Sequence, residues 1–176
     1  MQFKHMAFFA IIPLLVFVAC DSKNKIEEKI KYPKISLTTV RGANLEIITS
    51  ENTLTFSNYQ NKALLINFFA TWCPPCRAEF PHLNKLREKY KNDFEIINIL
   101  VSDKKSKEEM LAFMNEFNIQ YPTTNGVSNE LFAQHLGGIK TIPTMYLLKK
   151  DGSIMEKYKG MVPEEMLESD IQRAIK

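Results

Sequence analysis

Two cysteines, Cys73 and Cys76, stand on either side of a pair of prolines, and they are the residues of this sequence best suited to do chemistry. A thiolate is the nucleophile of thiol–disulfide exchange, and a thiol three helical positions further on can close a small ring with it. The first thiolate would attack the disulfide of a partner, and the second would resolve the mixed disulfide. We therefore predict a redox-active disulfide, with Cys73 as the attacking thiol and Cys76 as the resolving thiol.

Other uses of the cysteine pair are less favoured by the sequence. A purely structural disulfide more often joins distant segments, because closing a longer loop removes more entropy from the unfolded chain. A zinc site needs about four ligands, whereas the sequence has no second cysteine pair and its three histidines do not form an H-x-x-x-H pair. Covalent haem requires a histidine directly after Cys76, where Arg77 stands. We accordingly expect neither a metal nor a cofactor.

The segments around the cysteines predict how they are positioned. The apolar run Ala63–Phe69, broken only by Asn67, suits a strand buried on both faces. The stretch Arg77–Tyr90 repeats apolar residues at helical spacing. The cysteines would then lie where a buried strand passes into a helix, near unpaired N–H groups and the positive end of the helix dipole. We expect this position to lower the pKa of the Cys73 thiol below that of a free cysteine.

The first twenty residues have the character of a secretory signal. Lys4 is followed by an apolar stretch too short for a clear membrane span, so we assign residues 1–19 to a signal peptide. The ending Phe17–Cys20 resembles a bacterial lipoprotein signal, although Phe17 replaces the small aliphatic residue usual there. We therefore predict lipidation at Cys20 and a polar tether over residues 20–34. An uncleaved anchor is the alternative, and both place the domain outside the cytoplasm.

Composition restricts the remaining classes of function. Residues 35–176 are about enough for one domain, and the chain is 45% hydrophobic and 24% charged, as expected for a globular protein. The net charge of +3 is too small to indicate nucleic-acid binding, and the sequence has no basic stripe with interleaved aromatic residues. Nucleic acid is thus not an expected partner.

The rest of the chain predicts an α/β fold with a mixed sheet and helices on both faces. Ser106 and Glu109 form a capping-box pattern before a helix, and Pro143 stands near the start of a strand, where proline is tolerated. The other expected elements are a hairpin of Ile35–Thr39 with Leu45–Thr49, a buried strand Phe94–Val101, a helix Asn129–Leu136, strands Thr141–Leu148 and Ile154–Tyr158, and a last helix opened by Pro163.

From Ala63 onward the sequence resembles the thioredoxin superfamily, and more closely the TlpA/ResA-like (CcmG-like) membrane-anchored thiol–disulfide oxidoreductases. The resemblance is carried by Phe69–Pro81 (FATWCPPCRAEFP), Ile142-Pro143-Thr144 and Lys150-Asp151-Gly152. It implies a thioredoxin fold with Pro143 in cis beside the two sulfurs, and substrate binding at Trp72, Ile142 and Pro143. It also implies an extra segment, Phe113–Gly138, between the second helix and the strand that follows the proline.

One departure from thioredoxin concerns proton transfer. Asn67 stands where thioredoxin has a buried aspartate, and an amide cannot take or give a proton in this chemistry. Glu79 is the nearest acid in sequence and is therefore a candidate for proton transfer. The sequence favours a simpler interpretation of Glu79, as a carboxylate in the first helical turn that the helix dipole stabilises.

The resemblance implies an extracytoplasmic reductant of protein disulfides, lipid-anchored to a bacterial membrane in the cell envelope and facing the periplasm or the cell exterior. Apocytochrome c, whose Cys-x-x-Cys-His must be reduced before haem attachment, is the implied substrate. A membrane electron carrier of the DsbD/CcdA type is the implied donor, since a reductant in an oxidising compartment needs one. We expect the protein to be a monomer.

Two alternatives remain open at the level of sequence. The same chemistry would serve an oxidase or isomerase of secreted proteins, because the reduction potential sets the direction; Ile142 before Pro143 favours reduction. A copper-binding chaperone on the same fold is less favoured. Copper(I) binds paired thiolates, but copper-delivery relatives use a wider cysteine spacing with a histidine, which this sequence does not match.

Overall fold

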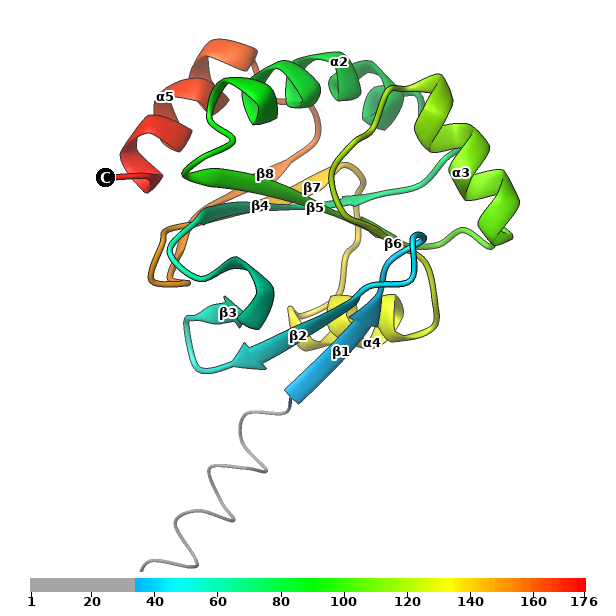
Figure 1. Ribbon diagram of the computed structural model, residues 1–176, viewed down its shortest axis with the longest axis horizontal. Helices are drawn as coiled ribbons and strands as arrows, with labels where there is room; N and C mark the ends of the chain where they lie inside the picture. The colour runs from blue at the N-terminus through cyan, green and yellow to red at the C-terminus, as the bar shows by residue number, and fades with distance from the viewer. Residues whose placement is uncertain (1–33) are drawn as a thin grey trace, which may run out of the picture. The chain divides into compact units, whose positions relative to one another are not determined.

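The computed structural model describes residues 34–176, which belong to one compact unit. The signal, lipidation and tether predictions for residues 1–33 lie outside the described residues. A five-stranded sheet runs through the middle of the unit in the order β6-β5-β4-β7-β8 (Figure 1). Its strands are β4 (Ala63–Phe69), β5 (Phe94–Leu100), β6 (Thr123–Thr124), β7 (Thr144–Leu148) and β8 (Ile154–Lys159).

The sheet is mixed, as predicted. Strand β4 is central, pairs in parallel with β5 and pairs antiparallel with β7. Every residue of β4 and of β5 is buried, because both faces of these strands are covered. The apolar run that precedes the cysteines is therefore the rigid centre of the fold, and its last residue, Phe69, leads directly into the loop with Cys73.

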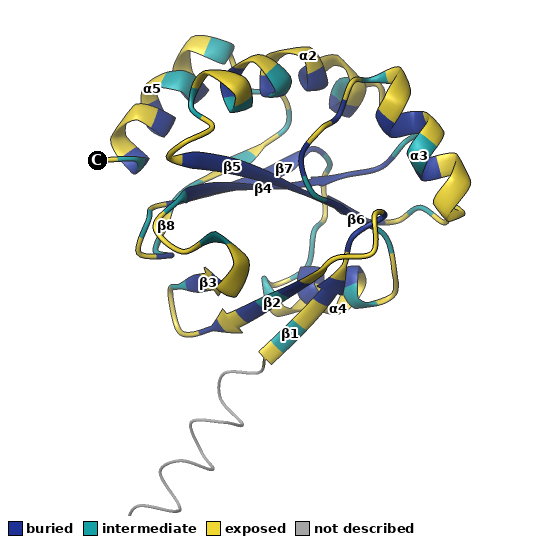
Figure 2. Ribbon diagram, in the orientation of Figure 1, coloured by how far each residue is buried: buried dark blue, intermediate teal, exposed yellow. Residues whose placement is uncertain are grey.

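Helices cover the two faces unequally. Helices α2 (Pro74–Lys89), α3 (Lys107–Glu116) and α5 (Glu164–Ala174) pack on one face, which we call the α2 face. The opposite α4 face is covered by α4 (Ser128–His135) together with a small three-stranded sheet (Figure 1). Figure 2 shows buried residues along the inner side of each of these helices. The prediction of helices on both faces is confirmed, and this is a thioredoxin-like arrangement.

The predicted N-terminal hairpin is present and has a third strand. Strands β1 (Lys34–Thr38), β2 (Asn44–Thr49) and β3 (Leu54–Phe56) form an antiparallel sheet in that order. A 3₁₀ turn, η1 (Ser57–Tyr59), connects this sheet to β4. The sequence did not predict β3, because three residues are too few to show an alternating pattern.

The strand predicted for Thr141–Leu148 is shorter than expected. β7 begins only at Thr144, and the preceding residues form a bend that contains a cis peptide bond between Ile142 and Pro143. Proline has no N–H to donate to a ladder, which explains why pairing starts after it. The cis bond agrees with the resemblance, and so does the insertion: β6 and α4 lie between α3 and β7.

Candidate active site

Cys73 is the N-cap residue of α2, where the sequence placed it. Its backbone is extended, and the N–H of Arg77 donates to its carbonyl oxygen to begin the helix (3.1 Å). The N–H of Cys76 points at the Cys73 sulfur, 3.3 Å away. The two sulfurs form a disulfide with 5.3 Å between the Cα atoms, and the residues are only 2% and 1% exposed. The predicted pairing is confirmed.

The loop between β4 and α2 is tied to the loop that follows β5. The backbone N–H and the hydroxyl of Thr71 both donate to Asp103 Oδ2, at 2.8 and 2.6 Å. The indole N–H of Trp72 donates to the carbonyl oxygen of Ser102 (3.2 Å), although Trp72 as a residue is 59% exposed. Trp72 therefore stands next to the disulfide as an exposed but oriented aromatic surface.

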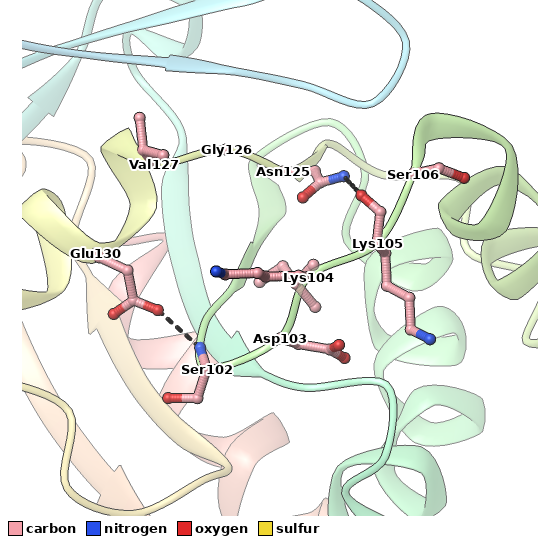
Figure 3. Close-up of a pocket in the computed structure, with 10 residues that line it drawn as sticks. Ser102, Asp103, Lys104, Lys105, Ser106, Asn125, Gly126, Val127 and Glu130 are labelled. Atoms are coloured by element: carbon pink, nitrogen blue, oxygen red, sulfur yellow. Dashed lines mark hydrogen bonds between the residues drawn. The ribbon is translucent and has the colours of Figure 1, made fainter.

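Helix α4 contributes to this support. Ser102 has a positive φ of 53°, and its backbone N–H donates to Glu130 Oε1 on α4 (2.7 Å). Figure 3 shows this bond at the edge of a hollow of about 710 Å³ between residues 102–106 and 125–130, with Lys104 lying across it. The inserted helix thus holds the residue that orients Trp72.

The segment before β7 forms the other side of the site. Ile142 is half-buried and packs against the apolar cluster that includes both cysteines. Within residues 34–176, neither the N–H nor the carbonyl of Ile142 has a hydrogen-bond partner, whereas the carbonyl of Pro143 accepts from the N–H of Gly160 (2.8 Å). Ile142 consequently offers a free stretch of backbone, which is what an added peptide strand requires.

Glu79 corrects the interpretation that the sequence favoured. Because α2 begins at Pro74, Glu79 lies in the second turn and not the first, and it is only 4% exposed. Its Oε1 accepts from the backbone N–H of Val162 (3.0 Å), while its Oε2 has no partner among the described residues. Burial raises the pKa of Glu79 to about 7, against smaller opposing effects of the Val162 N–H and of His82.

Two buried amides extend this polar region across the sheet. The Asn67 side-chain N–H donates to Asn98 Oδ1 on the neighbouring strand (3.0 Å), which leaves Asn67 Oδ1 and Asn98 Nδ2 unpaired. The hydroxyl of Tyr121 also has no partner of normal geometry. Burial raises the pKa of Tyr121, whereas the neighbouring Asn98 lowers it. The sequence analysis missed Asn98 and Tyr121, but an asparagine inside the apolar run of β5 was a visible signal.

Neither of the two histidines in the described residues, His82 and His135, belongs to the buried site. His82 Nδ1 and Glu164 Oε2 are 2.6 Å apart at the surface between α2 and α5. His135 is exposed at the end of α4. Across the described residues, no group of three or more histidine, cysteine, aspartate or glutamate side chains could hold a metal ion.

Comparison with known proteins places this site in a family. The model of the Redoxin family matches residues 27–175. The chain belongs to the Redoxin family. The thiol–disulfide oxidoreductase ResA of Bacillus thuringiensis subsp. konkukian is 24% identical over 180 residues, covering 97% of each chain. The thioredoxin-like protein YneN of Bacillus subtilis is 25% identical over 150 residues, covering 83% of this chain and 79% of its own.

A solved structure shows the same arrangement. The thiol:disulfide interchange protein of Chlorobium tepidum TLS superimposes with a TM-score of 0.66 at 25% identity, covering 82% of this chain and 94% of its own. With the cysteine pair at the start of α2, these likenesses establish a TlpA/ResA-like member of the thioredoxin superfamily. This Redoxin-family protein is a thiol–disulfide oxidoreductase.

Proposed function

We propose that this protein reduces disulfides of other proteins outside the cytoplasm, with Cys73 as nucleophile and Cys76 as resolving thiol. The observation that carries the assignment is the position of the Cys73 sulfur at the N-terminus of α2, with the N–H of Cys76 directed at it. In the reduced protein the same N–H groups and the helix dipole would stabilise a Cys73 thiolate.

The exchange proceeds in two displacements. The Cys73 thiolate attacks one sulfur of the substrate disulfide; the substrate S–S bond breaks, and the other substrate sulfur leaves as a thiolate. Cys76 then loses its proton and attacks the Cys73 sulfur, which releases the second substrate thiolate. The substrate gains two electrons, and the protein is left with the Cys73–Cys76 disulfide.

Glu79 is the base that we assign to the second displacement. It follows Cys76 by three residues on the same buried face of α2, and its Oε2 is free to take a proton. A carboxyl with a pKa of about 7 is close to half-ionised at neutral pH, and this is the range in which proton transfer is most effective. The buried amide of Asn67 cannot perform this role.

The substrate would bind between Trp72 and the Ile142–Pro143 segment. The free backbone groups of Ile142 can pair with an extended chain, and the exposed face of Trp72 can pack against its side chains. The substrate disulfide would then lie over Cys73. This arrangement supports roles for Trp72, Ile142 and Pro143 in binding and not in the electron transfer itself.

The cellular setting is part of the proposal. We assign residues 1–19 to a signal peptide, Cys20 to lipidation and residues 20–34 to a tether, which would hold a monomeric domain, residues 35–176, on the outer side of a bacterial membrane. No helix within residues 34–176 is long and apolar enough to cross a bilayer. Apocytochrome c is the proposed substrate and a DsbD/CcdA-type protein the proposed electron donor, consistent with the likeness to ResA.

Trapping with a Cys76→Ser variant tests the substrate. Without the resolving thiol, the mixed disulfide has no internal exit, so substrates should accumulate on Cys73 and can be identified by mass spectrometry. Chains with Cys-x-x-Cys-His should dominate, and Cys73→Ser should trap none of them. A broad set of secreted proteins, together with normal cytochrome c maturation in a deletion strain, would favour an oxidase or isomerase instead.

Metabolic labelling tests the anchor. A labelled fatty acid should enter the wild-type protein and not a Cys20→Ala variant, and the wild type should sediment with membranes. A wild-type protein that never takes up the label would exclude lipidation but leave the redox assignment in place.

A further inference from the structure

Three lysines converge next to the proposed substrate groove. Lys140, Lys157 and Lys159 line a hollow of about 230 Å³, together with Thr141 and Thr144, which flank the Ile142–Pro143 segment. None of the lining residues is acidic. Among the described residues, none of the three lysines forms an ion pair, and the Lys157 ammonium lies over the ring of Tyr146 (4.6 Å).

The sheet explains why the charges collect on one side. On β8, Lys157 pairs with Tyr146 and Lys159 with Thr144, so both lysines face the side that α4 covers. The acidic residue directly before them, Glu156, pairs with Leu147 and points to the opposite face, where it lies 3.6 Å from Arg173. Lys140 comes from the segment after α4. Two separate parts of the chain therefore bring unneutralised positive charge to the edge of the groove.

Protection of a sheet edge accounts for only part of this pattern. β8 is an edge strand, and lysines on edge strands prevent pairing with other chains. That reason applies to Lys157 and Lys159, but not to Lys140, which is not in a strand, nor to the hollow that the three share. The hollow is smaller than the roughly 300–1,000 Å³ of small-molecule sites, so it suits side chains of a docked polypeptide better than a free ligand.

A second lysine-lined hollow provides a comparison. Lys62, Lys149 and Lys150 line a hollow of about 240 Å³ together with Asp151. Here two of the lysines are engaged: Lys62 donates to the carbonyl of Lys91 (2.6 Å), and Lys150 pairs with Asp93 (2.7 Å). Lys149 follows the last residue of β7 and is five residues from Thr144, which is roughly 16 Å at 3.3 Å per residue. Within residues 34–176, the hollow at the end of the sheet near the cysteines thus has three lysines without an ion pair, whereas the hollow at the other end has only Lys149 left unengaged.

We propose that Lys140, Lys157 and Lys159 form a docking site for a carboxylate-rich segment of the polypeptide substrate, next to its disulfide. The inference rests on the proposed reduction of protein disulfides and specifies which proteins are reduced fastest. A chain lying along Ile142 would bring its flanking side chains over Thr141 and Thr144, within reach of the ammonium groups. Such charges at a rim act mainly on the association rate, and salt weakens their effect.

Synthetic disulfide peptides test the docking site. Three peptides would be identical except for three residues beside the reacting cysteine, which are Glu, Gln or Lys. Their second-order rate constants with the reduced protein can be followed by the fluorescence of Trp72, the single tryptophan of the chain. We expect the Glu peptide to react about tenfold faster than the Gln peptide at low salt, and the Lys peptide to react slower still. The preference should shrink at 0.5 M salt, because the Debye length is then only about 4 Å and the lysines are largely screened.

Matched variants separate the site from net charge. K140Q/K157Q/K159Q should abolish the preference for the Glu peptide, whereas K62Q/K149Q/K150Q, with the same loss of charge, should keep it. Both variants should reduce the uncharged 2-hydroxyethyl disulfide at the wild-type rate. If the first triple variant does not fold, K140Q and K159Q alone should each remove part of the preference, because both lysines are exposed.

The outcomes distinguish this inference from the function on which it rests. Equal rates for the three peptides in the wild type, or equal loss of preference in both triple variants, would overturn the docking site and leave the reductase assignment intact. A wild-type protein that reduces neither the peptides nor the small disulfide would overturn both. Selective loss in K140Q/K157Q/K159Q establishes the site.

Discussion

Both faces of the central sheet are buried, but they differ in how far their polar groups are paired. Among the described residues, five buried side-chain atoms have no hydrogen-bond partner, and all lie on the α2 side: they belong to Asn67, Glu79, Asn84, Asn98 and Tyr121. On the α4 side, the buried Asn129 amide donates to the carbonyls of Leu100 (2.8 Å) and Thr124 (3.2 Å). The difference follows the position of the cysteines, which also lie on the α2 side.

An unpaired buried polar atom costs about 1–3 kcal/mol, so several of them on one face require a reason. The α4 face needs only to be stable, and it is filled with apolar and aromatic residues such as Ile66, Phe68 and Phe132. The α2 face contains Cys76, which is 1% exposed and which the proposed mechanism requires to lose a proton. We infer that the buried carboxyl of Glu79 is kept for proton transfer at a cost in stability, and the predictions below test this contrast between the two faces.

The largest loss of stability is expected from a substitution on the α4 face, Phe56→Ala. Phe56 is fully buried there, with its ring 6.4 Å from that of Phe132. Phe56→Ala should lower the free energy of unfolding by about 3–5 kcal/mol, measured by denaturant titration of the oxidised protein. The rate of disulfide exchange per folded molecule should stay within twofold of wild type. A large drop in that rate would mean that the two faces are not functionally distinct.

Glu79→Gln should affect chemistry more than folding. The variant keeps an acceptor for the Val162 N–H but cannot take the Cys76 proton, so resolution of the mixed disulfide should slow by about 100-fold at neutral pH. Single-turnover kinetics with a peptide disulfide would measure the rate of this resolution step. The rate of the first displacement, by Cys73, should be little changed. Equal slowing of both steps would indicate a structural role for Glu79.

The raised pKa of Glu79 predicts that the stability of the protein depends on pH. Burial raises the pKa of Glu79 from 4.5 to about 7, so between these values the folded protein holds a proton that the unfolded chain releases. The stabilisation that comes from this bound proton is fully present below about pH 4.5. It is lost as the pH rises through 7, which lowers the free energy of unfolding by at most about 3 kcal/mol. Oxidised wild-type protein should therefore lose stability over this range relative to Glu79→Gln. A difference that grows in the opposite direction would contradict the raised pKa.

The local frame of the site could be predicted because its signals are local. The buried strand before Cys73, the helix after Cys76 and the capping box of Ser106 each depend on residues close in sequence. The capping box is formed as expected, with Ser106 and Glu109 bonded to each other's backbone N–H groups.

What could not be predicted depends on distant contacts. Burial of Glu79 requires the segment after β8 to fold over α2, so that the Val162 N–H meets its carboxylate 83 residues away in sequence. β6 has only two residues and exists because β5 offers an edge to pair with. The link from Glu130 through Ser102 to Trp72 likewise joins three segments that no sequence pattern connects.

The buried amide pair should show strong energetic coupling. Asn67→Leu or Asn98→Leu alone removes one partner of their hydrogen bond and leaves the other amide buried, which should cost about 1–2 kcal/mol. The double variant replaces both partners by apolar side chains of similar size and should recover most of the loss. Unfolding free energies of the four proteins form a double-mutant cycle. Additive losses would show that the amides act independently.

The smallest effect on stability and on the resolution rate is expected for Tyr121→Phe. This variant tests whether Tyr121 takes part in proton transfer together with Glu79. The variant removes a hydroxyl that has no partner of normal geometry and leaves the buried ring in place, so stability should change by less than about 1 kcal/mol and could rise. If the Tyr121 hydroxyl takes no part in proton transfer, the rate of mixed-disulfide resolution stays within threefold of wild type, and Glu79 alone carries the proton. If the hydroxyl relays the proton, the rate falls together with its pH dependence while stability is maintained.

We expect the first result, because burial raises the pKa of Tyr121 and thereby opposes its ionisation. A tenfold loss of rate without loss of stability would instead place Tyr121 in the proton path with Glu79.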